Sequence, residues 1–471
     1  MNEIFENAEN DATLISSDKI VFGRDELVNM IESKEFANLK NELIKLPAAD
    51  IAELFYETDE KYHALIYRLL PKESAAEVFV EMDAELKEQI INSFTDIELS
   101  AMLDELYIDD TVDIIEEMPA TVVKRIIRNS SKENRGIINR LLKYPKDSAG
   151  TIMTTEYVRF TKDMTVEDAL SHIRRVAIDK ETIYTCYITD DRRHLIGIIT
   201  AKELLIADLK TRLFAIMEES VIFVNTTDDR EDVARKFDRY GFLALPVVDA
   251  ECRLVGIVTV DDAISVLKEE TEEDFAKMAA ITPSEKSYLK TSIGSLWKNR
   301  IPWLMLLMIS ATLSSTILNK FEAALPAILL IFVPMLMDTG GNCGAQASVT
   351  VIRALSVGEA KISDLPRILW KETRVGIMCG ATLGAVAFLK VILVDKLLMQ
   401  NPEITFSVAF SVSAAVALTI IVAKIIGSTL PLLAKKIGFD PAVMASPFIT
   451  TLVDAIALVM YFFVSSLLIA V

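Results

Sequence analysis

Asp454 lies about one third of the way into an otherwise apolar or hydroxylic stretch that runs from Pro447 to Val471. A charged side chain at membrane depth is costly, so such residues usually face a bundle interior or a water-filled path and mark an ion or proton route. The alternative is an aspartate that is hydrogen-bonded to a neighbouring Ser or Thr and only helps helices to pack. We favour the ion site, because ionisable groups inside membranes are functional by default.

A second polar stretch, Met337 to Ser348, lies inside another apolar segment and contains three glycines, two carboxamides and a carboxylate. Polar or irregular backbone at that depth is tolerated where it lines a cavity or is buried in protein. The glycines could instead serve close helix–helix packing. Together with Asp454, this stretch favours an ion path. We expect the path to be lined by Asp338, Asn342, Pro447, Thr450 and Thr451.

The two stretches offer hard oxygen ligands, namely carboxylates, hydroxyls, amides and the backbone carbonyls near Pro447. The four cysteines and three histidines of the chain are scattered and form no thiolate–imidazole set, which disfavours zinc and copper. Magnesium keeps several waters and is bound through one or two carboxylates plus carbonyls. One aspartate per chain is a thin site, but a twofold dimer would place two Asp454 carboxylates across its axis.

The chain changes composition near Trp297. Its 471 residues contain 49 Lys+Arg and 68 Asp+Glu, of which residues 297–471 hold only 13 and 9. The acidic excess therefore belongs to the preceding part, which we interpret as a soluble assembly. It argues against nucleic acid as a partner, because phosphates bind basic faces. It suits cations, although a solvated acidic surface is the commoner meaning of such an excess.

Five apolar segments of near or above 20 residues, the length that spans a bilayer, follow the soluble part. Basic residues precede the first segment and lie between the second and third and between the fourth and fifth. By the positive-inside rule, the amino terminus is cytoplasmic and Val471 is outside. The charged residues 1–50 indicate no signal peptide. We expect a multi-pass protein of the cell (inner) membrane, in contact with lipid, with spans at 301–319, 325–356, 373–394, 405–434 and 442–470.

Residues 25–143 show short amphipathic helical segments that repeat about every 24 residues, as in Ile51–Phe55, Ala75–Phe79 and Ser100–Asp104. A period of that order indicates stacked helical pairs that form a small superhelical domain. By itself, such a domain suggests only a scaffold or a docking surface.

Residues 144–265 contain two copies of a strand–strand–helix unit, each with a Met-containing lead-in, Ile152-Met153 and Ile216-Met217. The copies resemble a tandem pair of CBS domains, a regulatory α/β module. Such domains bind the ribose of a nucleotide through a string that Gly256–Asp262 matches. The resemblance makes Thr259 and Asp262 the candidate ligands of ATP or another adenine nucleotide, whereas the first copy has Glu203 at the acidic position.

A long amphipathic helix is expected from Asp261 to Met278, with five carboxylates within residues 269–274. A charge run of this kind is usually a solvated face. Here it lies on the segment that joins the sensor-like module to the membrane part, which favours a role in coupling the two.

Along nearly its whole length the chain resembles the MgtE family of magnesium channels or transporters. The matching strings are Lys146–Thr154, Thr339–Asn342 and Pro447–Asp454. The resemblance implies a homodimer that is not an enzyme and that holds Mg²⁺ at Asp454 in its pore. It implies a multidomain membrane protein: an all-α superhelical N-terminal domain (1–143), α/β tandem CBS domains (144–210 and 211–265), a long connecting plug helix (266–296) and a five-helix transmembrane domain (297–471).

The resemblance also implies that cytosolic Mg²⁺ closes the pore by bridging carboxylates of the N-terminal, CBS and plug segments. Gly241 and Ser265 stand where the family pattern has aspartates, which predicts the loss of one regulatory site. Carried over position by position, the regulatory ligands are Asp109, Asp113, Asp229, Glu231, Asp262, Glu270, Glu273, Asp274 and Asp440.

Three other functions are alternatives to a self-regulated Mg²⁺ channel. A secondary exchanger would couple a divalent cation to Na⁺ or H⁺, with Asp338 as the coupling carboxylate. A CBS-regulated anion transporter would need basic groups at the permeation site, which Asp454 argues against. An intramembrane enzyme would need a nucleophile–base pair or a metal-ligand set, and the sequence shows neither.

Overall fold

The computed structural model describes residues 22–284, 288, 291–322, 326–444 and 446–469. These residues form two compact units, which divide in the sequence between Leu267 and Lys268. Residues 1–21, which belong to the charged amino-terminal stretch, lie outside the described part.

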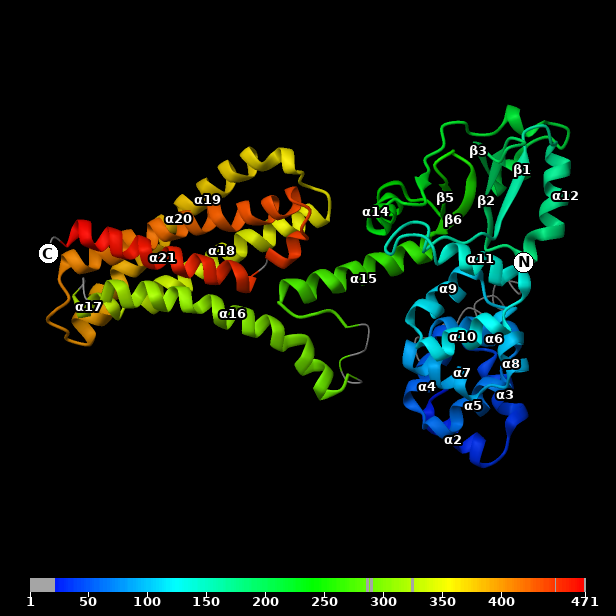
Figure 1. Cartoon of the computed structure of the whole chain (residues 1–471), viewed down its shortest axis with the longest axis horizontal. Coiled ribbons are helices and arrows are strands. Elements are labelled where there is room, and N and C mark those ends of the chain that lie inside the picture. Colours follow the sequence, from blue (N-terminus) through cyan, green and yellow to red (C-terminus); the bar gives the residue numbers. More distant parts are fainter. Residues whose placement is uncertain (1–21, 285–287, 289–290, 323–325, 445, 470–471) are drawn as a thin grey trace, which may run out of the picture. The chain divides into compact units, whose positions relative to one another are not determined.

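From Phe22 onward, where the described part begins, the first unit opens with ten helices in chain order, drawn in blue to cyan in Figure 1. They are α2 (Arg24–Glu32), α3 (Phe36–Leu43), α4 (Ala48–Glu57), α5 (Glu60–Leu69), α6 (Lys72–Val80), α7 (Ala84–Ser93), α8 (Asp96–Leu103), α9 (Ile108–Glu117), α10 (Ala120–Asn129) and α11 (Lys132–Leu141).

The predicted repeat is present in these helices. The residues that precede α4, α6, α8 and α10 are Pro47, Pro71, Thr95 and Pro119, each 24 residues after the last. Proline suits a helix start because its missing N–H would have no partner there, and Thr95 forms a capping box with Glu98. Buried positions recur along these helices with the same period of 24 residues, which confirms the predicted superhelical domain.

Two three-stranded sheets follow, one in each CBS copy. The first contains β1 (Tyr157–Thr161), β2 (Thr182–Thr189) and β3 (Leu195–Thr200), and the second contains β4 (Val224–Asn225), β5 (Ala244–Val248) and β6 (Leu254–Thr259). In both, the first strand is parallel and the third antiparallel to the middle one. The helices are α12 (Val166–Val176), α13 (Ala201–Ile206) and α14 (Arg230–Tyr240).

The methionine lead-ins cross between the two CBS copies. A Cβ added at Gly256 would lie 2.7 Å from the sulfur of Met153, and one added at Gly197 would lie 2.8 Å from the sulfur of Met217. Thr154 also pairs with Ile257, and Ile198 pairs with Glu218. Each lead-in therefore packs on the sheet of the other copy, which explains why the copies fold together.

The second unit holds the membrane helices. Its elements are the later part of α15 (Val260–Met278), then α16 (Ile293–Glu322), α17 (Ala327–Leu330), α18 (Val333–Ser356), α19 (Leu365–Lys390) with π-helical turns to Leu398, α20 (Phe406–Lys436) and α21 (Ser446–Leu468). Within the described residues, five helical segments are long and apolar enough to cross a membrane, in agreement with the five predicted spans.

The second predicted span is not one continuous helix. Helix α17 ends at Leu330, and α18 begins at Val333 with Pro334 in its first turn. Proline cannot donate the backbone hydrogen bond that would continue the preceding helix. The polar stretch from Met337 is therefore fully helical, and the irregular backbone lies before it.

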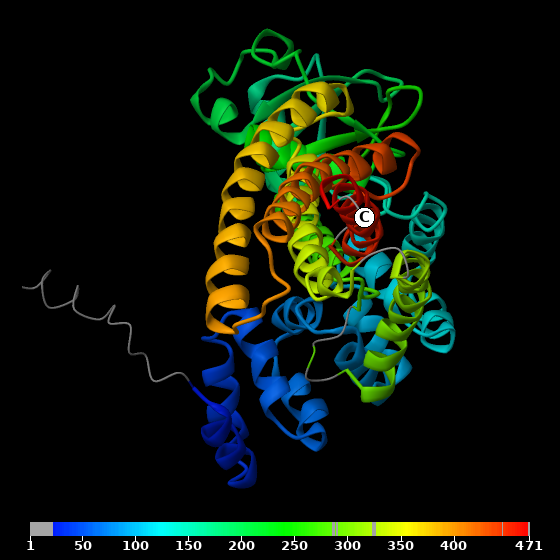
Figure 2. The same cartoon turned by 90° about the vertical axis from the view of Figure 1, so that its left-hand side faces the viewer.

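Helix α20 is the centre of the membrane unit, because α18, α19 and α21 all pack against it. Figures 1 and 2 both show α19 running beside α20. Helices α18 and α20 cross at Gly344 and Gly427, where an added Cβ on Gly427 would overlap the carbonyl oxygen of Gly344. Such glycine contacts let backbones approach closely in membranes.

Replacing Gly427 by alanine should therefore destabilise the membrane unit by about 1–3 kcal/mol or more, since overpacking a tight contact moves backbone. Thermal unfolding of the detergent-solubilised chain measures the effect. Gly294→Ala is the control, because the added Cβ in α16 meets no atom within 4 Å. Equal melting temperatures for the two variants would contradict the tight crossing.

Candidate functional site

The expected ion site lies where α21 approaches α18. Asp454 is partly buried, and a Cβ added at Gly341 of α18 would lie 3.3 Å from its Oδ1. Glycine at 341 thus lets the carboxylate lie directly against α18. At the start of α21, the hydroxyls of Thr450 and Thr451 each donate to the carbonyl of Pro447 at 2.9 Å. That carbonyl is satisfied, while the hydroxyl oxygens keep lone pairs for a cation or water.

Helix α18 carries a polar stripe, which we define as Asp338, Asn342, Gln346 and Thr350. Their spacing of four places them on one face of the helix, and all four are exposed in the single chain. The amide of Asn342 donates to Oδ1 of Asp338 at 3.2 Å, and Asp338 is close enough to act on Asp454 as a like charge. The structure extends the predicted lining by Gln346 and Thr350.

A cavity of about 700 Å³ lies along the polar stripe. Its lining comes from two helices, with the larger part from α18 and one side chain from α20. The residues are Asn342, Ala345, Gln346, Val349, Thr350 and Lys424. Polar side chains around a cavity at membrane depth are what an aqueous ion path requires.

A second site lies in the first unit, where α9 approaches the start of α15. Asp109 and Asp113 of α9 share an electrostatic environment with Asp262 of α15, and Asp110 and Glu181 belong to the same group. We call these five residues the acidic cluster. The structure therefore brings together three of the predicted regulatory carboxylates and adds two that the sequence analysis missed.

The pKa values of the carboxyl groups in the acidic cluster are raised. Burial, followed by repulsion from Asp262 and other carboxylates, raises the pKa of Asp109 well above its ordinary value. Burial and neighbouring charges likewise raise the pKa of Asp262 to about 7 and that of Glu181 to about 8. Burial raises the pKa of Asp110 to about 6, although Lys87 acts in the opposite direction. Bringing these carboxylates together without a counter-ion is unfavourable.

The acidic cluster fits a hard divalent cation. Among the described residues, Oδ1 of Asp109 and Oε2 of Glu181 are buried without a hydrogen-bond partner. No three His, Cys, Asp or Glu side chains in the described ranges already converge at ligand distance. Magnesium nevertheless keeps several waters and can bridge carboxylates through them, so spaced carboxylates with free oxygens suit it.

The predicted plug ligands lie in the second unit, at the end of α15. Nζ of Lys277 lies 2.6 Å from a carboxylate oxygen of Glu273 and 2.6 Å from one of Asp440. Ser356 donates to Asp274 at 2.9 Å. Glu270 lies one helical turn before Asp274. The ammonium of Lys277 thus joins two of the predicted ligands.

Asp229 and Glu231 lie at the start of α14 and not in the acidic cluster. Oδ1 of Asp229 accepts from the backbone N–H of Glu231 at 2.8 Å, and Glu231 forms an ion pair with Arg235. Gly241 ends the same helix with a φ of 67°, a left-handed conformation that favours glycine. Ser265 is exposed on α15. The departure at Gly241 thus has a local backbone reason.

The nucleotide string of the second CBS copy is internally bonded. The hydroxyl of Thr259 donates to Asp262 at 2.6 Å, and Asp262 also belongs to the acidic cluster. Thr200 and Glu203 make the equivalent bond in the first copy, at 2.9 Å. A nucleotide at Thr259 and Asp262 would therefore compete with the hydrogen bond between these two side chains and with the contacts of Asp262 in the acidic cluster.

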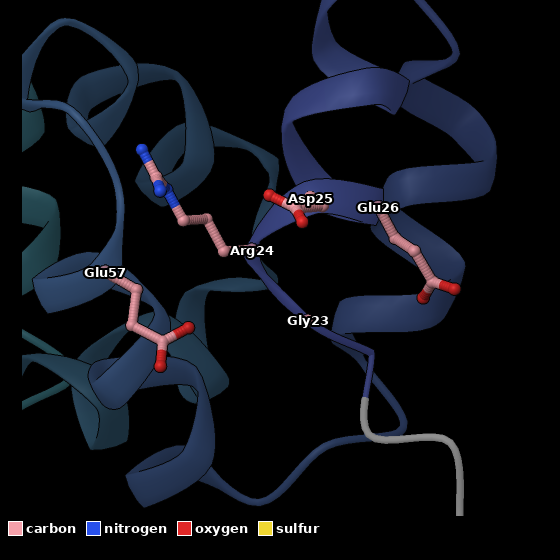
Figure 3. A pocket seen from close by; sticks show the side chains of 5 residues that line it. All are labelled: Gly23, Arg24, Asp25, Glu26 and Glu57. Carbon is pink, nitrogen blue, oxygen red and sulfur yellow. The ribbon is translucent and has the colours of Figure 1, made fainter.

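A hollow of about 600 Å³ at the start of α2 is lined by Gly23, Arg24, Asp25, Glu26 and Glu57. Figure 3 shows that the side chains of Arg24, Glu26 and Glu57 point in different directions. Ligand sites need polar groups that converge. This hollow is therefore not a candidate site.

Comparison with known proteins agrees with this architecture. Residues 333–464 match the family described as MgtE, divalent cation transporter, residues 46–147 match the MgtE intracellular N domain, and residues 149–210 and 213–269 match the CBS domain. The chain is similar to the magnesium transporter MgtE of Thermus thermophilus, at 35% identity over 91% of this chain and 95% of the relative. It is also similar to that of Bacillus subtilis, at 30% identity over 93% and 95%.

Among solved structures, one similar to this chain is the cytosolic domain of the Mg²⁺ channel MgtE in complex with ATP. It is 35% identical, with a TM-score of 0.50, and the match covers 52% of this chain and 99% of that structure. The similarity to each of the two transporters extends over nearly the full length of this chain and of the relative. The chain is therefore not an enzyme but a multi-pass membrane protein, and it belongs to the MgtE family of magnesium transporters.

Proposed function

We propose that this chain is a Mg²⁺ channel that acts as a homodimer and is closed by cytosolic Mg²⁺. The observation that carries the proposal is the position of Asp454. This partly buried carboxylate lies against Gly341, next to the exposed polar stripe of α18. Magnesium passing this point would keep part of its hydration shell and exchange the rest for carboxylate, hydroxyl and carbonyl oxygens. The ion here is the transported substrate.

A second copy of the chain would complete the path. Four polar side chains exposed along one membrane helix cannot face lipid without a large cost. A twofold partner would cover the polar stripe and bring a second Asp454 to the axis. We assign the soluble unit to the cytoplasmic side and the carboxyl terminus to the outside. The reason is that basic residues flank the membrane spans mainly on the side of the soluble unit. We also propose that the domains have the boundaries that the sequence predicts.

The acidic cluster supplies the regulatory part of the proposal. Without divalent cations its carboxylates repel one another, and Mg²⁺ would relieve the repulsion and favour the compact arrangement of α9, the CBS pair and α15. A ligand that binds one arrangement better shifts the population toward it. Glu270, Glu273, Asp274 and Asp440 would extend this control to the plug, and Asp229 and Glu231 would act at a separate position.

A nucleotide would add a second regulatory input. The relative's cytosolic domain has been crystallised with ATP, and Thr259 and Asp262 occupy the matching string here. Because Asp262 also belongs to the acidic cluster, a nucleotide bound there would alter the binding of cations to the cluster.

The proposal is tested by recording currents from the reconstituted full-length chain in symmetric salt while cytosolic Mg²⁺ is stepped. A channel gives an electrogenic Mg²⁺ current that falls as internal Mg²⁺ rises. Flux that needs a Na⁺ or H⁺ counter-gradient and carries no current would instead establish the exchanger, with Asp338 as its coupling carboxylate. An Asp338→Asn variant then separates the two, since it would uncouple an exchanger.

A further inference from the structure

Lys424 is a further ionisable residue within the membrane unit, and the only cation that lines the cavity along the polar stripe among the described residues. It lies on α20 twelve residues before Lys436, which places it about 18 Å from the basic end of the helix at 1.5 Å per residue. Its exposed fraction is only 6%. Charged residues at this depth are costly and mark ion pathways by default, so the ammonium needs an explanation.

The partner of Lys424 is Glu372 of the neighbouring helix α19. Nζ of Lys424 and Oε2 of Glu372 are 4.0 Å apart, and the side chain of Glu372 is 12% exposed. This separation allows an ion pair but is too long for a hydrogen bond. One turn further along α19, Gly376 packs beside the lysine stem: an added Cβ would lie 3.5 Å from the lysine Cβ, an ordinary contact, and 3.2 Å from the backbone of Ile421. Helix α19 thus fixes where the ammonium lies.

Stability does not explain this pair. Taking two opposite charges out of water costs about as much as their attraction returns, and apolar replacement of such a pair is often neutral. The longer separation weakens the pair further. The feature that distinguishes Lys424 is instead that it lines the cavity along the polar stripe, with Asn342, Gln346 and Thr350 opposite.

We propose that Lys424 is a tethered cation that limits the passage of Mg²⁺ through this cavity, with Glu372 offsetting its charge. This inference rests on the proposed channel function and names a residue that sets its throughput. Coulomb energy scales with the charge of the ion, so the ammonium acts twice as strongly on Mg²⁺ as on a monovalent cation. Loss of the lysine alone leaves a carboxylate beside the path and attracts Mg²⁺. Loss of the glutamate alone leaves an uncompensated positive charge and repels it.

The test compares Mg²⁺ current and the Mg²⁺-to-K⁺ permeability ratio in reconstituted full-length variants. Lys424→Met should raise both, and Glu372→Gln should lower both, each by roughly tenfold or less, the lower end of electrostatic effects in charged clefts. The double variant carries no charge at this position and should return close to the wild-type values. Lys424→Arg keeps the charge and is the matched control.

Two outcomes would overturn the inference. One is an unchanged permeability ratio in Lys424→Met; the other is a decrease in every variant together with a lower melting temperature, which would assign the pair to stability. If Lys424→Met does not accumulate, the swapped pair Lys424→Glu with Glu372→Lys retains both charges and should still alter the ratio. Failure of both variants to fold would likewise assign Lys424 to stability.

The same recordings separate this inference from the channel proposal. A wild-type Mg²⁺ current that requires Asp454 but ignores Lys424 rejects only the tethered cation. A current that does not require Asp454 rejects the ion path itself.

Discussion

Asp454→Asn should reduce the Mg²⁺ current by roughly 30-fold or more, while the chain still folds and inserts. Asparagine matches aspartate in size and keeps one oxygen acceptor, so the packing against Gly341 survives. The charge is lost, and with it an attraction that would offset the loss of hydration waters. Removing one partner of a desolvated charge pair costs roughly 2–5 kcal/mol, and each 1.4 kcal/mol corresponds to a factor of ten. In the proposed dimer, both carboxylates are lost at once.

The measurement is Mg²⁺ uptake into liposomes that contain the full-length chain and an internal Mg²⁺ indicator. Asp395→Asn is the control. Asp395 is another buried carboxylate of the membrane unit, but it is bonded to the ammonium of Lys390 at 2.8 Å and lies outside the cavity along α18. Uptake that survives in Asp454→Asn, or falls equally in both variants, would remove Asp454 from the ion path.

The difference between Asp454 and Glu181 illustrates what the sequence could and could not predict. Asp454 is a carboxylate within an apolar stretch, and this contrast is visible in a few neighbouring residues. Glu181 precedes a strand of the first CBS copy and is locally ordinary. It joins the acidic cluster only because the fold brings it near Asp109 and Asp262, and no spacing along the chain indicates that proximity.

Lys424 could be predicted from the sequence only in part. Its charge within an apolar helix is as visible in the sequence as that of Asp454, yet its partner and its cavity depend on how α18, α19 and α20 pack. Lys424 is not among the residues predicted from the sequence. The positions of Gly344, Gly376 and Gly427, where these helices approach one another, set that packing.

The same distinction holds for the fold. The 24-residue helical repeat and two strands of each CBS copy, β2 with β3 and β5 with β6, follow from local periodicity and were predicted. Strands β1 and β4 were not predicted. Strand β4 has only two residues, and each of the two strands depends on its pairing with the middle strand of its sheet. The break between α17 and α18 was also missed, since apolar composition continues across it and only Pro334 marks it.

Raising the pH from about 5 to about 8 without divalent cations should loosen the contact between α9 and the CBS pair. The ordinary pKa values of Asp262 and Glu181 are 3.8 and 4.5, and the folded protein raises them to about 7 and about 8. The folded state thus holds protons that the unfolded state releases above about pH 4. This contribution to stability is fully present at low pH and is lost as the pH rises through the folded values.

Magnesium should reverse the loosening at pH 8, because it replaces the protons as the counter-charge of the acidic cluster. Hydrogen exchange of peptides from Ile108–Glu117 in the full-length chain, corrected for the intrinsic pH dependence of exchange, measures both effects. We expect protection to fall by roughly tenfold between pH 5 and pH 8 and to return with Mg²⁺, as local opening free energies of α9 change. Potassium at equal ionic strength separates specific binding from screening.

The double variant Asp109→Asn with Asp262→Asn decides whether the acidic cluster is the cause. Two neutral amides remove most of the repulsion, so protection of α9 should become nearly independent of Mg²⁺ and less dependent on pH, with the pH dependence that burial of Glu181 causes remaining. Asp229→Asn, at the start of α14, should keep the wild-type response, because its contacts lie outside the cluster. A double variant that still tightens with Mg²⁺ would move the regulatory site away from α9 and toward the carboxylates at the end of α15.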